Sequence, residues 1–381
     1  MHRANAYLIV AVQLAVLLAL AGCARLGVPE GWSEGVVVGD ILYIGTMEGD
    51  LRALNIGTGE TIWRFELRGE EEANRAIYGT PAIAGDTLYI GGYDGRLYAL
   101  PLNGGDGGDQ VREIWDVGVG GGEPIVGSAV IADGLVLVGS SDGSMYAFDI
   151  SDGSLQWTFP TGNKVWSTPA VADGVAYFGS LDHKVYAVSL EDGKEAWQSP
   201  FSAKGAVTAT PLIANGRVYV GAFDSVFYAI DAATGREVSR FDGANKWYWG
   251  GAVASGDTIY APSLDGNLYA LDIDTLELRW VLETNGALVG SPVVVFDRLA
   301  VASLDGRVRL VGLSDGADEQ QCNVGAKLRA SLALHEDVIY MAAVDHSVRA
   351  LKVKPNGNPD EQWVHFTNQE DPVPRDWVRS C

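Results

Sequence analysis

A motif recurs about every 40 residues along this chain, and it restricts the possible folds more than any other feature. The clearest copy runs from Trp166 to Trp197, where short alternating apolar segments are separated by polar turns. The acidic residue of its central turn, Asp182, has seven counterparts spaced 40 to 48 residues apart, namely Glu48, Asp94, Asp142, Asp224, Asp265, Asp305 and Asp345. One four-stranded sheet cannot cover both of its own faces, so such units must stack side by side in a ring. The repeat therefore predicts an all-β, eight-bladed propeller of four-stranded antiparallel blades.

The copy that contains Asp182 shows the expected strands most clearly. Turns are predicted at Asp173-Gly174, Asp182-His183 and Asp192-Gly193, where the chain must reverse within a few residues. The four strands between and around these turns are expected at 168–172, 175–179, 185–190 and 195–198. No segment after residue 22 has a helical pattern.

The repeat also decides the domain organisation. A chain of 381 residues exceeds the usual size of a single core, but similar units that close on themselves form one domain. We expect a lipoprotein signal peptide at 1–22, a lipid-anchored linker at 23–31, the propeller at 32–368 and a C-terminal tail at 369–381. The formal net charge of -22 repels phosphate backbones, so nucleic acid is not expected as a partner.

The N-terminal segment has the features of an export signal. His2 and Arg3 precede an apolar run at 6–19, which is too short for a permanent membrane span and ends in small residues. The following Leu20-Ala21-Gly22-Cys23 resembles the bacterial lipobox, which implies that Cys23 becomes the lipidated first residue of the mature protein. Ala24 follows, where an Asp would favour the inner membrane, so the resemblance implies the outer membrane of a two-membrane cell. The alternative is an ordinary signal peptide with an incidental cysteine.

Tryptophans recur on the outermost predicted strand. Four of them lie 15 residues after a turn acid, at Trp63, Trp157, Trp197 and Trp280, whereas insertions displace Trp115 and Trp363. The fifth and seventh repeats lack this residue. Wedged between adjacent blades, each ring would bury ~150 to 250 Å². We therefore expect a structural docking role for these tryptophans.

Two segments carry a family resemblance. The stretches 218–237 and 268–280 look like the pyrroloquinoline-quinone (PQQ) type of propeller repeat with its tryptophan-docking motif, and the likeness covers nearly all of the chain after the signal segment. That family has a branch of quinoprotein dehydrogenases and a non-catalytic branch of envelope lipoproteins, which includes BamB-type subunits of the outer-membrane β-barrel assembly machinery. The lipobox, the repeat number and the chain length favour the second branch.

The dehydrogenase branch implies features that this sequence lacks. Membership of that branch implies a longer chain, two adjacent cysteines beside the quinone, and a set of acidic and amide residues that binds calcium. The cysteines of this chain, Cys23, Cys322 and Cys381, are not adjacent to one another. The G-x-S-x-G pattern at 139–143 falls in a predicted hairpin, not in the strand-to-helix turn that a nucleophile needs. We therefore expect no enzymatic activity, no cofactor and no metal site. PQQ with calcium remains the alternative.

Two cysteines are left once Cys23 carries lipid. Exported chains reach compartments where thiols oxidise, so the sequence predicts a disulfide between Cys322 and Cys381.

One variable column of the repeat is a candidate binding site. In a propeller, the residue that precedes each inner strand surrounds the mouth of the central channel, and here this column reads Trp32, Tyr78, Val126, Trp166, Thr208, Trp249, Val289 and Arg329. The adjacent connections add Trp247 and several cations, among them Lys164 and Lys246. Aromatic and basic residues are typical of interaction hot spots, so we predict a partner-binding mouth formed by Trp32, Tyr78, Lys164, Trp166, Lys246, Trp247, Trp249 and Arg329. The alternative is that these rings only cap the inner strands.

Together these patterns predict an exported, lipid-anchored, monomeric propeller on the periplasmic or extracellular side of a membrane. Its expected function is that of a non-enzymatic scaffold that binds an envelope protein or an extended peptide segment, and the resemblance implies outer-membrane protein assembly as one such role. A quinone-dependent dehydrogenase or another small-ligand-binding protein is the alternative function.

Overall fold

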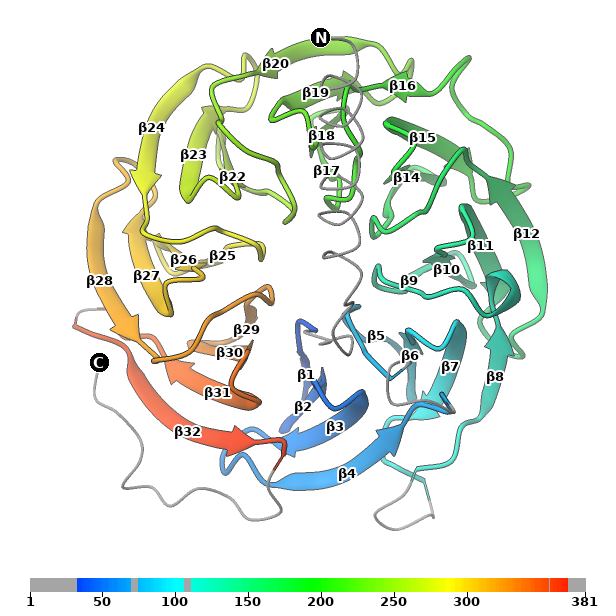
Figure 1. Ribbon diagram of the computed structural model, residues 1–381, viewed down its shortest axis with the longest axis horizontal. Coiled ribbons are helices and arrows are strands. Elements are labelled where there is room, and N and C mark those ends of the chain that lie inside the picture. Colours follow the sequence, from blue (N-terminus) through cyan, green and yellow to red (C-terminus); the bar gives the residue numbers. More distant parts are fainter. Residues whose placement is uncertain (1–32, 70–74, 106–110, 356, 369–381) are drawn as a thin grey trace, which may run out of the picture.

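The computed structural model describes residues 33–69, 75–105, 111–355 and 357–368. In it, eight four-stranded antiparallel sheets form a ring around a central channel, with the first strand of each sheet innermost and the fourth outermost (Figure 1). The predicted eight-bladed propeller is therefore confirmed. The predicted signal segment, linker and C-terminal tail lie outside the described residues.

The first four blades follow chain order. Blade one contains β1 (Val36–Val38), β2 (Ile41–Gly45), β3 (Asp50–Asn55) and β4 (Thr61–Glu66). Blade two contains β5 (Ala82–Ala84), β6 (Thr87–Gly91), β7 (Arg96–Pro101) and β8 (Trp115–Gly118). Blade three contains β9 (Val130–Ala132), β10 (Leu135–Gly139), β11 (Ser144–Asp149) and β12 (Leu155–Pro160). Blade four contains β13 (Ala170–Ala172), β14 (Val175–Gly179), β15 (Lys184–Ser189) and β16 (Phe201–Ser202).

The other four blades repeat this plan. Blade five contains β17 (Leu212–Ala214), β18 (Arg217–Gly221), β19 (Phe227–Asp231) and β20 (Glu237–Phe241). Blade six contains β21 (Val253–Ser255), β22 (Thr258–Pro262), β23 (Asn267–Asp272) and β24 (Leu278–Glu283). Blade seven contains β25 (Val293–Val295), β26 (Arg298–Ala302), β27 (Arg307–Gly312) and β28 (Asp318–Asn323). Blade eight contains β29 (Ala333–His335), β30 (Val338–Ala343), β31 (Ser347–Lys352) and β32 (Asp360–Phe366).

Helical structure is minimal in the part of the chain that the structure describes. It contains one 3-10 turn, η2 (Gly120–Gly122), between blades two and three. None of the described residues belongs to a helix with the length and apolar character needed to cross a membrane.

The outer strand of blade four differs from the prediction. The expected strand at 195–198 is wrong, because Glu195 makes only an isolated bridge to Val188 and the regular pairing begins at Phe201 opposite Val185. In blade three the corresponding Phe159 follows its tryptophan by two residues, whereas Phe201 follows Trp197 by four. The two extra residues of this repeat are not hydrogen-bonded in the β-ladder with the third strand. The outermost strand tolerates this interruption because it pairs with a neighbouring strand on one side alone.

In blades four, five and six the turn acid ties the middle hairpin to the connection that enters the same blade. In blade four, Asp182 accepts hydrogen bonds from the Tyr186 hydroxyl at 2.6 Å, from the Lys184 amide at 3.1 Å and from the Gly162 amide at 2.8 Å. Asp224 and Asp265 make the same three contacts in blades five and six. These acids are therefore committed to folding, as hairpin chemistry predicts.

The predicted docking tryptophans lie between neighbouring blades. Trp197 packs on Tyr177 of its own blade, with ring centroids 5.7 Å apart, and its Nε1 donates to the Ala232 carbonyl of blade five at 2.8 Å. Gly235, with φ 71°, leaves room for the ring, since a Cβ there would lie 2.6 Å from Trp197. Equivalent glycines face the other five tryptophans, Trp63, Trp115, Trp157, Trp280 and Trp363. The displaced Trp115 and Trp363 thus reach the same position despite their insertions.

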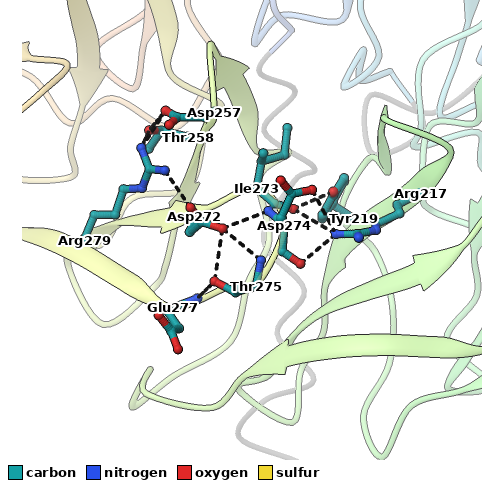
Figure 2. A network of polar contacts seen from close by, with 10 residues as sticks. All are labelled: Arg217, Tyr219, Asp257, Thr258, Asp272, Ile273, Asp274, Thr275, Glu277 and Arg279. Atoms are coloured by element: carbon teal, nitrogen blue, oxygen red, sulfur yellow. Dashed lines mark hydrogen bonds and ion pairs between the residues drawn. The ribbon is translucent and has the colours of Figure 1, made fainter.

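Polar contacts replace the tryptophan in blade five. Figure 2 shows Arg217 of β18 directed at blade six, where it donates to the Asp274 carbonyl at 2.7 Å. The neighbouring Tyr219 donates to the Ile273 carbonyl at 2.7 Å, a contact that the equivalent tyrosines also make in blades that keep the tryptophan. Leu276 stands where other blades have the docking glycine and is buried in the interface. In blade seven, Arg298 donates to Gln320 of its own blade and to the Lys354 carbonyl of blade eight.

Side chains close the ring between blades eight and one, since each blade consists of consecutive strands and no strand is exchanged. Leu42 and Ile44 pack with Tyr340 and Trp363 in one buried cluster. Beside it, Arg52 of β3 pairs with Asp50 at 3.0 Å, approaches His365 Nε2 of β32 at 3.1 Å and donates to the Thr367 carbonyl at 2.5 Å. We call Asp50, Arg52, His365 and Thr367 the closure cluster.

Candidate functional site at the channel mouth

The connections between blades and the middle hairpins share one face of the ring. For example, the Leu181 amide of the blade-four hairpin donates to the Lys164 carbonyl at 2.9 Å, and Leu264 of blade six donates to the Trp247 carbonyl at 2.9 Å. This arrangement is the one expected from the repeat. It brings the variable column to the end of the channel that we call the mouth.

A cavity of about 310 Å³ occupies the channel at the mouth. The seven described members of the variable column all line it: Tyr78, Val126, Trp166, Thr208, Trp249, Val289 and Arg329. Trp32, the eighth member, lies outside the described residues. The structure therefore joins residues that are about 40 positions apart in sequence into one site.

A second layer of the cavity lies two residues further along each connection. Six of its positions carry hydroxyl groups: Thr80, Ser128, Thr168, Thr210, Ser291 and Ser331. Several of these oxygens accept a backbone N–H from the preceding blade, as in Thr80 N to Ser128 Oγ and Ser128 N to Thr168 Oγ1, both at 2.8 Å. Glu34 and Gly251 take the two remaining positions. The layer thus fastens inner strands together and also lines the channel with polar groups.

An aromatic stack runs from the channel to solvent. Trp166 lies 6.4 Å from Trp249, Trp249 stacks on Phe223 at 5.7 Å, and Phe223 stacks on Trp247 at 4.6 Å with planes 9° apart. Trp247 is 49% exposed. We call Trp166, Trp249, Phe223 and Trp247 the aromatic stack. It offers an apolar path that leads from the surface of blades five and six into the cavity.

The predicted cations lie around this stack at different depths. Lys164 places its ammonium group 5.5 Å from the centre of the Trp166 ring, a cation–π contact, and its side chain is exposed. Lys246 is exposed next to Trp247 and does not line the cavity, whereas Arg329 does.

Three site residues were missed by the sequence analysis. Phe223 and Tyr93 directly precede a turn acid, a column that holds smaller aliphatic or polar residues in other repeats. Glu34 occupies the hydroxyl column two residues after the variable one. Reading those two columns across the repeats as the first was read would have identified all three residues.

Glu34 is the one carboxylate among the described residues that line the cavity. Burial raises its pKa to about 7, with a hydrogen bond from Thr80 opposing the shift. Calcium takes six to eight oxygen ligands, commonly several carboxylates. No three His, Cys, Asp or Glu side chains of the described ranges gather closely enough to bind a metal ion. The donor set present in the channel therefore does not fit a calcium-bound quinone.

Cys322 lies in β28 opposite Val308 and is buried between blades seven and eight. It is disulfide-bonded in the structure, while Cys381 lies outside the described residues, so the pairing remains a prediction. We expect neither cysteine to react with a thiol reagent in denaturant before reduction, and both to react after it, since exported thiols oxidise. Labelling followed by peptide mass spectrometry makes this measurement. Labelling of Cys381 without reduction would contradict the pairing.

Comparisons with known proteins agree with this architecture. The structure of BamB from Moraxella catarrhalis has a TM-score of 0.68 at 20% identity, covering 85% of this chain and 95% of that one. The computationally designed Ika8 protein has a TM-score of 0.73 at 16% identity, covering 86% and 98%. Quinohemoprotein alcohol dehydrogenase from Comamonas testosteroni has a TM-score of 0.66 at 13% identity, covering 84% and 70%. At these identities the likeness shows the fold alone.

A search of curated protein sequences finds no match to this chain. A family model described as "Outer membrane protein assembly factor BamB" matches residues 30–116, 107–232 and 223–355. These segments cover most of the chain and extend from blade one into blade eight, in keeping with the observed blades. The chain therefore belongs to this BamB-like family of PQQ-type repeat propellers.

Proposed function

We propose that this protein is a non-enzymatic scaffold of the cell envelope that binds an extended segment of a partner protein at the channel mouth. The aromatic stack is the observation that carries the proposal. Trp247 exposes a large apolar ring, and stacked rings connect it through Phe223 to Trp249, which lines the cavity. Aromatic residues in such positions supply much of the binding energy of protein interfaces.

Blade-to-blade variation supports the same location. The turn acids and docking tryptophans recur because folding requires them, whereas the mouth column varies from tryptophan to threonine to arginine. The BamB description of the family makes a role in outer-membrane protein assembly the specific form of the proposal.

Truncation of the stack tests this function. We expect Trp247→Ala and Trp249→Ala each to weaken partner binding by about 1 to 2 kcal/mol, because each removes a stacked ring from the contact surface. The measurement is quantitative recovery of the partner from detergent-solubilised envelope, followed by titration with that purified partner.

Phe296→Ala is the matched control. Phe296 is a large exposed ring in the β25–β26 turn, on the face opposite the mouth, so its removal should leave partner binding unchanged. If Trp247→Ala, Trp249→Ala and Phe296→Ala all bound the partner as tightly as the wild type, the mouth would be ruled out as the binding surface. Saturable PQQ binding that is lost in Trp249→Ala would favour the small-ligand alternative.

The proposed location predicts a lipid anchor. Cys23 lies outside the described residues, and the Leu-Ala-Gly-Cys sequence supports its lipidation. We expect mass spectrometry of the mature protein to show a diacylglycerol-modified Cys23 at its terminus, and Cys23→Ala to release the protein from membranes, since stable anchoring depends on the acyl chains. An unmodified terminus, or unchanged membrane association of the variant, would contradict the anchor.

A further inference from the structure

Glu34 departs from the pattern of the channel layer to which it belongs. The hydroxyl groups of that layer accept backbone N–H groups between blades, a role that accounts for their recurrence. A carboxylate is not needed for this role. Ser33 fixes the position of Glu34, because its hydroxyl accepts from Gly45 N at 3.1 Å and donates to the Glu34 carbonyl at 2.7 Å.

The Glu34 carboxyl lacks a compensating positive charge among the described residues. Burial is the largest influence on its pKa, the Thr80 hydrogen bond is the second, and no neighbouring cation contributes. Arg329 lines the same cavity but does not offset the Glu34 charge. Burying an uncompensated carboxylate costs stability, so its retention at the channel wall points to a ligand that supplies the charge.

A second polar group in the cavity also lacks a partner. Thr208 is 7% exposed and lines the cavity, and its Oγ1 makes no hydrogen bond in the described structure. The walls are aromatic, with Tyr78 and Tyr93 paired at 5.6 Å on blade two and Trp166 and Trp249 paired on blades four and six. The Glu34 carboxylate and these aromatic faces together form an environment suited to a cation.

We propose that the channel binds a primary ammonium group, either a lysine side chain or a free amino terminus of the bound partner segment, with Glu34 as its counter-ion. The inference rests on the proposed binding of such a segment at the mouth. The ammonium N–H groups can donate to the Glu34 carboxylate, while the methylene chain lies against the aromatic faces of Trp166 and Trp249. A cavity of about 310 Å³ is at the small end of ligand pockets and suits one side chain better than a cofactor.

Short amine probes test the proposal on the purified protein. Nα-acetyl-lysine amide represents the side chain, and Gly-Ala-Ala amide represents a free amino terminus. Each has an uncharged counterpart, made by acetylating its remaining amine. Binding is followed by tryptophan fluorescence and by calorimetry. We expect at least one amine probe to bind about tenfold or more tightly than its acetylated counterpart, and the preferred probe identifies the source of the ammonium group.

Variants and pH give independent readouts. Glu34→Gln should weaken binding of that probe about tenfold, whereas Glu60→Gln, an exposed glutamate of the same blade, should leave binding unchanged. The wild-type affinity for the lysine probe should rise as the pH increases through about 7, because Glu34 ionises while the lysine amine stays protonated. In Glu34→Gln that pH dependence should disappear. The melting temperatures of the variants confirm that each is folded.

Two results would overturn the inference: equal binding of charged and acetylated probes, or an amine affinity that is the same in Glu34→Gln as in the wild type. Its failure is distinguishable from failure of the proposed function. If amine binding is absent but Trp247→Ala and Trp249→Ala still weaken partner binding, the inference alone is wrong. If those variants bind the partner normally, the proposed function is wrong.

Discussion

Replacing Trp197 by alanine is expected to lower the free energy of unfolding by about 3 to 5 kcal/mol. The indole is 4% exposed, fills the space between blades four and five, and donates to the Ala232 carbonyl. Its removal leaves a cavity beside Gly235, whose backbone is held by the adjacent turn and cannot collapse fully into the space. Urea denaturation followed by circular dichroism measures the change.

The control for this prediction is another tryptophan in a different environment. Trp247→Ala removes a ring that is half exposed and stacks on Phe223 at the surface, so its free energy of unfolding should change much less than that of Trp197→Ala. Trp197→Phe should fall between the two, because it keeps an aromatic ring but loses the hydrogen bond to Ala232. If Trp197→Ala were as stable as Trp247→Ala, the docking role of this residue would be wrong.

Removing Arg52 is expected to destabilise ring closure by about 3 to 5 kcal/mol at neutral pH. Arg52 and Asp50 are 7% and 4% exposed, and Arg52→Met leaves the Asp50 carboxylate buried without its counter-ion. Arg64→Met is the matched control, since Arg64 lies directly opposite Arg52 on β4 with a side chain that is half exposed. The ion pair of Arg64 with Glu66 is exposed, and such a pair contributes about 1 kcal/mol or less to the free energy of unfolding.

The loss of unfolding free energy in Arg52→Met, called the deficit below, should depend on pH with a definite sign. Burial raises the pKa of Asp50, with Arg52 opposing the shift, so removal of Arg52 raises that pKa further. A raised carboxyl pKa favours the folded state at acid pH and loses this contribution as the pH rises. Burial and Arg52 also lower the pKa of His365 to about 4, and loss of the arginine removes its part of that shift while burial keeps the rest. Both effects make the deficit smaller at pH 5 than at pH 8, and a deficit that grows in acid would contradict the closure cluster.

Much of the fold could be predicted from the repeat alone. Eight copies of an alternating pattern with a turn acid allow few arrangements other than a ring of blades, because each sheet has to bury both faces. The column that forms the channel mouth followed from the same alignment, because equivalent positions of the repeats lie at the same distance from the channel axis and on the same face of the ring. Tyr78, Trp166, Trp249 and Arg329 were joined in one cavity for this reason.

Other features depended on contacts between blades that the alignment of repeats does not describe. The substitution of Arg217 for a docking tryptophan, and the continuation of the stack through Phe223, each involve two neighbouring blades. A repeat pattern specifies what each unit shares, whereas these contacts depend on what two particular neighbours do not share.

The amino-acid sequence by itself determined the number of blades, three of the four strands of blade four, the docking tryptophans and the channel-mouth column, because local turn chemistry and period-two alternation are written within each repeat. The tertiary structure alone decided how blade one meets blade eight, where the two extra residues of blade four leave the ladder, and how strongly burial raises the pKa of Glu34. The physical reason is the range of the interactions. Strand pairing within a blade is set by nearby residues, whereas desolvation and ring closure depend on groups that come together after the whole ring has formed.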